Sequence, residues 1–354
     1  MSLRGANLPT LLDKISEALA GRSFVSAFAL TGSRARGDNF AESDYDVLIV
    51  DTRDLPSPFL ERLVLEGESI DLEHAPLEWL TKRVPCDLDQ AIRESRILAD
   101  RDGFLASAQK WSKACNNDPT RMAGRMGEVI LRSEVLLSRA HSALSRLDYE
   151  SCILHGRMAA VEASRVLLEA KRIPYQPSRF AGLLRSAAEG MDLSLIIPSS
   201  DKVKDAMDSL RVIMQSMVGV TGANKGQPVD TIEQGWPFAY YSNGDFARRT
   251  LRLLDNLFAE DHLEDLVLYT QINGYKILEA YQQLLRPGTM VDFVTMLRQI
   301  KAQEQDPGVY GAAIILYDIQ DPSKAMASEV LKKTRGHVDA LNRLRTYSAL
   351  KAGP

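Results

Sequence analysis

The sequence predicts an α+β protein in which a small N-terminal sheet flanked by helices is followed by a mostly α-helical region. In the first third of the chain, short apolar segments typical of buried strands alternate with turn signals. Beyond residue 119, apolar residues recur instead at the spacing of amphipathic helices. The expected domains are 1–115, 119–217 and 246–354, with a loop at 218–245 between the last two.

The composition is that of a soluble globular protein. Of the 354 residues, 45% are hydrophobic and 25% are charged, and the net charge is -4 at pH 7. A protein that grips a long nucleic-acid backbone is expected to carry a basic excess, so that partner is disfavoured. We expect a cytoplasmic protein without membrane contact, because the sequence contains neither a signal-peptide pattern nor an apolar run of spanning length. The irregular spacing of the three cysteines predicts free thiols.

The N-terminal domain is expected to begin with a helix and a buried strand. The spacing of apolar residues predicts a helix over Leu8–Ala20, with Thr10 as its cap. The segment Phe24–Leu30 is apolar enough for a buried strand. Gly32 and Ser33 follow it, and two such small residues allow a tight turn whose amide groups can hold phosphate oxygens.

A second predicted strand, Tyr45–Val50, carries two acids near its start. Asp44 and Asp46 stand two residues apart, so the period of a strand sends both carboxylates to one face. Two carboxylates that close together repel unless a cation lies between them. Mg²⁺ is the expected occupant, since it favours one or two carboxylates together with the phosphates of a substrate.

A third acid is expected on the segment Ser69–Ala75, which alternates apolar and polar residues as a half-buried strand does. Asp71 and Glu73 share its polar face. Asp71 lies between two apolar residues and is the preferred third carboxylate; Glu73 is the alternative. With a nucleoside triphosphate and a metal ion in place, such an acid could hold a second ion and take the proton from an attacking hydroxyl.

Short signals complete this domain. A helix is expected from about Leu77 to Val84, a strand over Arg96–Ala99 and a helix over Phe104–Ala114. The polar run Asn116–Pro119 then breaks the pattern, and the domain boundary is placed there.

Together these motifs resemble the DNA polymerase beta-like nucleotidyltransferase superfamily. Its minimal core carries a Gly-Ser turn, then Asp-x-Asp, then one acid on a following strand; Gly32–Ser33, Asp44, Asp46 and Asp71 occupy those places in order. The fuller run Gly-Ser-Arg-Ala-Arg-Gly followed by Ser-Asp-x-Asp resembles the branch that includes the aminoglycoside nucleotidyltransferases. The resemblance covers roughly the first third of the chain. It implies a small mixed sheet in which the Gly-Ser turn holds the terminal phosphates, the first two aspartates carry metal ions and the third activates the acceptor.

Two arginines directly after the turn admit two interpretations. Arg34 and Arg36 could bind phosphate, because a guanidinium pairs with phosphate oxygens in a bidentate fork. They could equally be solvated residues in the first turn of a short helix.

Beyond the boundary the pattern predicts a pair of long antiparallel helices. One contains the apolar residues that recur between Val129 and Leu147, and the next is expected to open at Asp148 and stop at Lys171. Further helices are expected over 246–260, 262–285, 289–303 and 321–350, the last with Asp321 as cap and Pro322 at its first position.

His155, Glu162 and Glu169 form one polar stripe on the second long helix. The resemblance to aminoglycoside-modifying enzymes implies that a helical-domain acid such as Glu162 acts as the base on the acceptor hydroxyl. The alternative is an ordinary solvated face. Aromatic residues of the 218–245 loop, such as Trp236 and Tyr241, could likewise line an acceptor pocket or simply anchor the loop.

These features predict an enzyme, an Mg²⁺-dependent nucleotidyltransferase that moves a nucleoside monophosphate, first of all AMP from ATP, onto a hydroxyl of a small-molecule acceptor. The acceptor is antibiotic-like by resemblance. Two Mg²⁺ ions held by the three aspartates would steady the attacking and leaving oxygens. The alternatives are a nucleotide-binding regulatory or antitoxin-like module that acts through a protein partner, and an enzyme that modifies a protein or an RNA end. The sequence leaves the acceptor, the choice of triphosphate and the oligomeric state open, a homodimer included.

Overall fold

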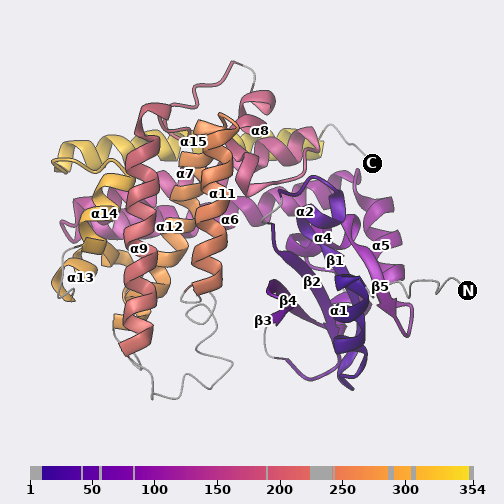
Figure 1. Ribbon diagram of the computed structural model, residues 1–354. Helices are drawn as coiled ribbons and strands as arrows, with labels where there is room; N and C mark the ends of the chain where they lie inside the picture. Colours follow the sequence, from indigo (N-terminus) through magenta and orange to yellow (C-terminus); the bar gives the residue numbers. More distant parts are fainter. Residues whose placement is uncertain are drawn as a thin grey trace, which may run out of the picture. The chain divides into compact units, whose positions relative to one another are not determined.

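The computed structural model describes residues 10–40, 43–55, 58–82, 84–188, 190–223, 241, 244–285, 291–303 and 308–350. The chain divides after Asn116 into two compact units. The described residues up to 116 are called the N-terminal unit, and those from 117 onward the helical unit. Figure 1 shows the strands and helices of both.

A five-stranded mixed sheet forms the framework of the N-terminal unit. Its strands are β1 (Val25–Thr31), β2 (Tyr45–Asp51), β3 (Phe59–Leu65), β4 (Glu68–Pro76) and β5 (Arg96–Asp100). The strand order is β3-β4-β2-β1-β5. β2 and β4 run parallel, whereas the other neighbouring pairs are antiparallel. The prediction of a small mixed sheet flanked by helices is confirmed.

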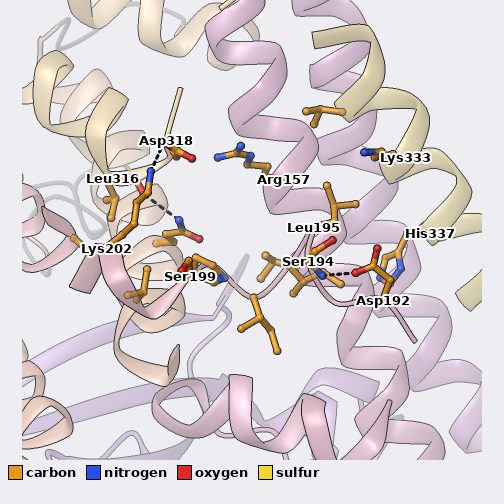
Figure 2. Close-up of a pocket in the computed structure, with 18 of the residues that line it drawn as sticks. Arg157, Asp192, Ser194, Leu195, Ser199, Lys202, Leu316, Asp318, Lys333 and His337 are labelled. Carbon is orange, nitrogen blue, oxygen red and sulfur yellow. Dashed lines mark hydrogen bonds and ion pairs between the residues drawn. The ribbon is translucent and has the colours of Figure 1, made fainter. Parts of the chain in front are cut away.

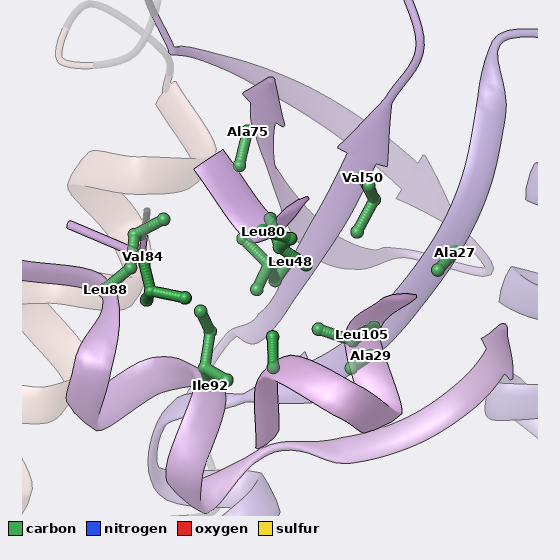
Figure 3. Close-up of a cluster of buried hydrophobic side chains, with 11 residues drawn as sticks. Ala27, Ala29, Leu48, Val50, Ala75, Leu80, Val84, Leu88, Ile92 and Leu105 are labelled. Atoms are coloured by element: carbon green, nitrogen blue, oxygen red, sulfur yellow. The ribbon is translucent and has the colours of Figure 1, made fainter. Parts of the chain in front are cut away.

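Helices cover both faces of this sheet. They are α1 (Leu11–Ala20), α2 (Gly32–Arg36), α3 (Leu77–Thr81), α4 (Asp89–Glu94) and α5 (Phe104–Cys115), with a short 3-10 turn η1 (Cys86–Leu88). On one face α1 packs over Val47 and Ile49 of β2. On the other face α3, α4 and α5 close over Leu48 and Val50 (Figure 3). Alternate side chains of β2 therefore pack into two hydrophobic cores, one on each face of the sheet. Each fully buried aliphatic residue stabilises the fold by roughly 1.5–3 kcal/mol.

Local signals set the boundaries of several elements. Thr10 caps α1 as predicted: its side chain accepts from the amide of Asp13, and the Asp13 carboxylate accepts from the amide of Thr10. α3 ends at Thr81 rather than at the predicted Val84. Pro85 disfavours helical backbone at Val84, which argues against the predicted end at that residue.

The sequence analysis missed β3 and α4. β3 is an edge strand whose residues are only partly buried, and Glu61 and Arg62 interrupt its apolar pattern. α4 has six residues, too few to show a helical period. Both elements are therefore fixed by packing against the rest of the unit rather than by their own pattern.

A hydrogen-bonded network of Asp51, His74 and Glu61 links β2, β3 and β4, with the partly exposed Arg22 and Arg53 at its ends. His74 is fully buried and bonds through Nδ1 to Asp51 at 2.8 Å and through Nε2 to Glu61 at 3.2 Å. Arg53 forks onto Asp51, and Arg22 forks onto Glu61 at 2.7 and 2.8 Å. Each carboxylate thus has a cationic partner, which buried charges require.

The helical unit contains α6 (Pro119–Ser145), α7 (Tyr149–Lys171), α8 (Phe180–Ala187), α9 (Val203–Ala223), α11 (Gly244–Ala259), α12 (Leu263–Leu285), α13 (Met296–Gln303), α14 (Gly308–Leu316) and α15 (Lys324–Leu350). Short 3-10 turns are η2 (Pro177–Arg179), η3 (Ser200–Lys202) and η4 (Phe293–Thr295). α6 and α7 form the predicted helical pair. α6 starts with Pro119 after the cap Asp118, and α7 starts after the cap Asp148.

The predicted helical segments 119–217 and 246–354 fall in one compact unit. The reason is long-range packing: α15 packs along both α6 and α7, and α12 packs on α9. α15 also begins at Lys324, so the predicted start at Asp321 and Pro322 is wrong. Asp321 has left-handed backbone, and Ser323 caps the helix by accepting from the amide of Met326 at 3.2 Å.

Among the described residues, no helix is both long and apolar enough to cross a membrane. The three cysteines, Cys86, Cys115 and Cys152, carry free thiols as predicted.

Candidate active site

The end of β1 creates a position that only glycine fits. Gly32 follows Thr31 with a φ of +67°, in the left-handed region that other residues rarely adopt. A Cβ atom at this position would lie 2.1 Å from Oδ2 of Asp46, which is far inside van der Waals contact. The backbone of the turn and the Asp46 carboxylate therefore lie in direct contact, and α2 begins at this point with Ser33 in its first turn.

Three aspartates converge beside this turn. Asp44 directly precedes β2, Asp46 lies in β2 and Asp71 lies in β4. The parallel pairing of the two strands places Asp46 opposite Asp71. One carboxylate oxygen from each residue lies within 4.8 Å of the others. Asp71 is buried, whereas Asp44 and Asp46 are partly accessible.

Arg62 is a member of this site that the sequence analysis did not identify. It lies opposite Asp71 in the antiparallel β3–β4 pair. Its Nε donates to Oδ1 of Asp71 at 2.7 Å and its terminal nitrogen donates to Oδ2 at 2.9 Å. Prediction of β3 would have placed this arginine on the strand next to the third acid.

The electrostatics of the group are those of crowded carboxylates. Burial raises the pKa of Asp71 to about 6, the neighbouring Asp44 adds to the rise, and Arg62 counteracts it. Three carboxylates face one guanidinium, which leaves negative charge at the partly accessible side. Hard oxygen donors with excess negative charge suit a divalent cation such as Mg²⁺.

Glu73 lies one repeat further along β4 and is not part of the group that Asp44, Asp46 and Asp71 form. It stands opposite Leu48 of β2. Burial raises the pKa of Glu73, and Asp87 adds to the rise. The structure therefore brings Asp71, and not Glu73, to the other two aspartates; the catalytic role of each stays a prediction.

Both arginines after the turn contact protein groups. Arg34 donates through Nε to the carbonyl oxygens of Ser43 at 2.8 Å and Asp44 at 3.2 Å, and its guanidinium lies 4.0 Å from the ring centre of Tyr45. Arg36 donates to Asp38 at 3.1 Å and to Glu94 of α4 at 3.0 Å. Their interpretation as merely solvated first-turn residues is wrong. Phosphate binding by either stays a prediction.

The polar stripe of α7 also differs from its solvated interpretation. His155 is fully buried, and its Nδ1 lies 3.0 Å from the Tyr275 hydroxyl. Arg165 donates to Glu162 at 2.8 Å, and Arg125 donates to Glu169 at 2.8 Å. The stripe thus faces other parts of the helical unit. The predicted role of Glu162 as an acceptor-side base stays a prediction. Of the aromatic residues named for the 218–245 loop, Trp236 lies outside the described residues, and the ring of Tyr241 packs edge-on against Phe246 with 5.3 Å between ring centres.

Comparison with known proteins identifies the type of domain. Residues 12–95 match the family model described as "Nucleotidyltransferase domain". This range includes Gly32 and all three converging aspartates. The N-terminal unit is a nucleotidyltransferase domain, and the chain is a transferase. The match is to the domain family as a whole and does not extend to the aminoglycoside branch.

Two further comparisons add little. No protein with a curated description matches the chain. Among solved structures, one similar chain is a nucleotidyltransferase-like protein from Exiguobacterium sibiricum, with 14% sequence identity over 86% of this chain and 87% of that chain and a TM-score of 0.33. A likeness of that extent does not bear on function.

Proposed function

We propose that the protein transfers a nucleoside monophosphate, AMP from ATP in the first instance, to a hydroxyl group of a small-molecule acceptor with the help of Mg²⁺. One observation carries the proposal: Asp44, Asp46 and Asp71 converge within 4.8 Å beside the glycine turn of a nucleotidyltransferase domain. A small acceptor is favoured over a long nucleic acid because the chain has a net charge of -4.

The donor set fits a divalent cation. Asp44, Asp46 and Asp71 supply hard carboxylate oxygens, and the space that a Cβ at position 32 would fill is occupied by the Asp46 carboxylate instead. When bound, two Mg²⁺ ions would neutralise charge on the attacking and leaving oxygens of the reaction. The three aspartates are the residues that would hold them.

In the proposed reaction the glycine turn binds the triphosphate, and Asp71 acts on the acceptor. We propose that the backbone amides of Gly32 and Ser33, at the start of α2, donate to phosphate oxygens of the triphosphate. The acceptor oxygen forms a bond to the α-phosphorus while the bond from that phosphorus to the bridging oxygen breaks, and pyrophosphate leaves. Asp71 takes the proton of the acceptor hydroxyl. Arg62, which holds both oxygens of Asp71, fixes the direction of that carboxylate.

On the acceptor side, Glu162 is proposed as the alternative base, which would take the same proton in place of Asp71, and a homodimer is proposed as one way to bring such a residue to the reaction. Glu162 already accepts hydrogen bonds from Arg165. An acceptor that displaced both this arginine and Arg132, which lies 3.3 Å from Glu162, would free the carboxylate for the hydroxyl.

Label transfer tests the proposal. Purified protein is incubated with each α-labelled nucleoside triphosphate, with and without Mg²⁺, and with panels of amino sugars, other hydroxylated metabolites and cell extract. We expect labelled product from at least one triphosphate, dependent on Mg²⁺. Asp46→Ala and Asp44→Asn should abolish transfer, whereas Asp54→Asn, a change at an exposed acid of the same unit, should not.

Two outcomes would contradict the proposal. Turnover that persists in both Asp46→Ala and Asp44→Asn would remove the aspartates from the reaction. Triphosphate binding without transfer to any acceptor would favour the regulatory module, and label on a protein or an RNA end would move the acceptor to another class.

A further inference from the structure

A recess in the helical unit combines apolar walls with charged groups. It has a volume of about 330 Å³ and is lined by residues of α6, α7, α8 and α12, together with Tyr175. Its apolar wall consists of aliphatic side chains and of the rings of Tyr175, Phe180 and Tyr275, and charged side chains make up the rest of the lining. Cavities of this size and lining are typical sites for small organic molecules.

Positive charge exceeds negative charge around this recess. Four cationic side chains gather there: Arg132, Arg139, Arg165 and Lys276. Glu162 accepts from Arg165 at 2.8 Å and lies 3.3 Å from Arg132. Glu279 accepts from Arg139, which also donates to the Tyr275 hydroxyl at 3.1 Å. Two carboxylates therefore face four cations.

The nearest further acid does not restore the balance. Glu169 acts on Arg165 through its charge, but it is bound by Arg125 at 2.8 Å. Counting that pair adds one charge of each sign. Within the described residues, an excess of positive charge remains at the recess.

Lys276 is the cation of this group that lacks a direct partner among the described residues, although Glu162 and Glu279 act on it through their charge. Within the part of the chain that the structure describes, it makes neither a hydrogen bond nor an ion pair. Its side chain is exposed to solvent, yet the surrounding protein lowers the pKa of its ammonium group, by desolvation first and by the charge of Arg165 second. An ammonium group in such a place is stabilised by an anion that reaches it.

A larger cavity of the same unit provides the contrast (Figure 2). Its volume is about 560 Å³, and its cationic side chains have partners. Lys202 pairs with Asp318 at 2.6 Å, Lys333 lies 3.5 Å from Glu329, and Arg157 donates to the carbonyl oxygen of Tyr317. The larger cavity therefore has fewer cationic groups that are available to bind an anion than the smaller recess has.

We propose that the recess lined by Lys276 binds a small organic anion whose apolar or aromatic body lies against the aliphatic and aromatic wall and whose phosphate or carboxylate group pairs with Lys276. The site belongs to the helical unit. Glu162, which is proposed as an acceptor-side base, also lines it, but the binding proposed here needs no transfer reaction. Aromatic rings in the wall favour a flat aromatic body.

Calorimetric titration of the full-length protein tests the site with three probes that share one ring system: 1-naphthyl phosphate, 1-naphthoate and neutral 1-naphthol. The buffer contains no divalent metal and has low salt, and each titration is repeated with excess ATP to separate this site from the glycine turn. We expect both anions to bind more tightly than 1-naphthol and to be insensitive to ATP. The phosphate and carboxylate arms show which anionic group is preferred.

Variants sharpen the result. Lys276→Met keeps the length of the side chain and should weaken both anions at least about ten-fold, whereas Lys276→Arg should retain binding. Lys332→Met, a change at an exposed lysine of α15, is the matched control and should bind as the natural protein does. Val135→Trp adds bulk at a wall residue that is 48% exposed and should weaken all three probes.

Equal affinity of the natural protein and Lys276→Met for the anions would overturn the proposal. So would equal affinity for 1-naphthol and the anions, or binding that Val135→Trp leaves unchanged. Competition by ATP that persists in Lys276→Met would assign the probes to the N-terminal unit instead and would also overturn the proposal.

Discussion

Replacing Gly32 with alanine tests the contact on which the site depends. The new Cβ would lie 2.1 Å from Oδ2 and 3.1 Å from Cγ of Asp46, so the carboxylate must move. The φ of +67° adds a backbone penalty of about 1–2 kcal/mol for a residue with a side chain. Forcing Asp46 away from its preferred rotamer costs about 0.5–1.5 kcal/mol more. We expect Gly32→Ala to lower the free energy of unfolding by about 1.5–3.5 kcal/mol.

Gly37 offers a matched control at the other end of α2. Its φ is +80°, and a Cβ built there meets no atom within 4 Å. Gly37→Ala should therefore show the backbone penalty alone. The difference between the two alanine variants then measures the displacement of Asp46.

A double-mutant cycle isolates that displacement. In an Asp46→Ala background the carboxylate is absent, and the Cβ of residue 46 lies 3.4 Å from the new methyl group, an ordinary contact. Gly32→Ala should then cost no more than Gly37→Ala, which gives a coupling of about 0.5–1.5 kcal/mol between positions 32 and 46.

Urea unfolding of the four proteins of the cycle gives these free energies, and the rise in melting temperature on adding Mg²⁺ reports the metal site. Gly32→Ala should lose most of the Mg²⁺-induced rise, and Gly37→Ala should keep it. The reasoning is refuted if the two glycine variants are equally destabilised, or if the coupling is zero and Gly32→Ala still responds fully to Mg²⁺.

Three further predictions concern buried charges. Arg62→Met removes the partner of the Asp71 carboxylate, which is 4% exposed, so we expect a loss of about 3–5 kcal/mol in unfolding free energy. We also expect Mg²⁺ to stabilise this variant more than it stabilises the natural protein. An unchanged Mg²⁺ response would contradict the placement of Asp71 in the metal site. Burial lowers the pKa of His155 to about 4. Between about pH 6.5 and 4 the unfolded state therefore binds a proton that the folded state does not bind. The stability that His155 contributes is lost as the pH falls through that range. His155→Gln should reduce the loss of unfolding free energy over this range by on the order of 3 kcal/mol, and identical pH profiles would count against it. Hydrogen bonding to His74 and Arg22 lowers the pKa of Glu61 to about 2. The stability that Glu61 contributes is therefore present above its ordinary pKa of 4.5 and is lost as the pH falls toward 2. Glu61→Gln should flatten the pH dependence of the unfolding free energy below pH 4.5 and leave it unchanged above that pH.

Local patterns predicted most of the sheet and its acids. β1, β2 and β4 each have an apolar run or a clean alternation, and Asp44 and Asp46 sit on one face because the strand period requires it. The caps of α1 and α7 were equally readable from Thr10 and Asp148. These features depend on neighbours within a few residues, which a sequence displays directly.

Features that depend on distant partners were not readable in this way. β3 is identified as a strand by its pairing with β4 and not by its own sequence pattern. The same pairing identifies Arg62 as a residue of the site. His155 has a polar side chain on an otherwise amphipathic helix and yet is fully buried, because Tyr275 of α12 supplies a hydrogen bond from far along the chain. In each case the deciding contact comes from another element.

The choice between Asp71 and Glu73 shows why the alternation of apolar and polar residues alone does not identify the third acid of the site. A shift of the β2–β4 pairing by two residues would move Glu73 to the position opposite Asp46 and leave every side chain on its present face, so the alternation of β4 is compatible with both acids. The two positions differ in depth: one repeat of about 6.6 Å along the strand separates them. Glu73 stands beside Leu48, whose side chain belongs to the core under α3, α4 and α5, whereas Asp71 stands beside Asp46 at the turn. A pairing shifted by two residues would also withdraw Asp71 from Asp46, leaving the buried pair of Asp71 and Arg62 without the acid that now lies opposite it. The observed register, in which Asp46 pairs with Asp71 and Leu48 with Glu73, thus selects the third acid, and the alternation of β4 alone does not.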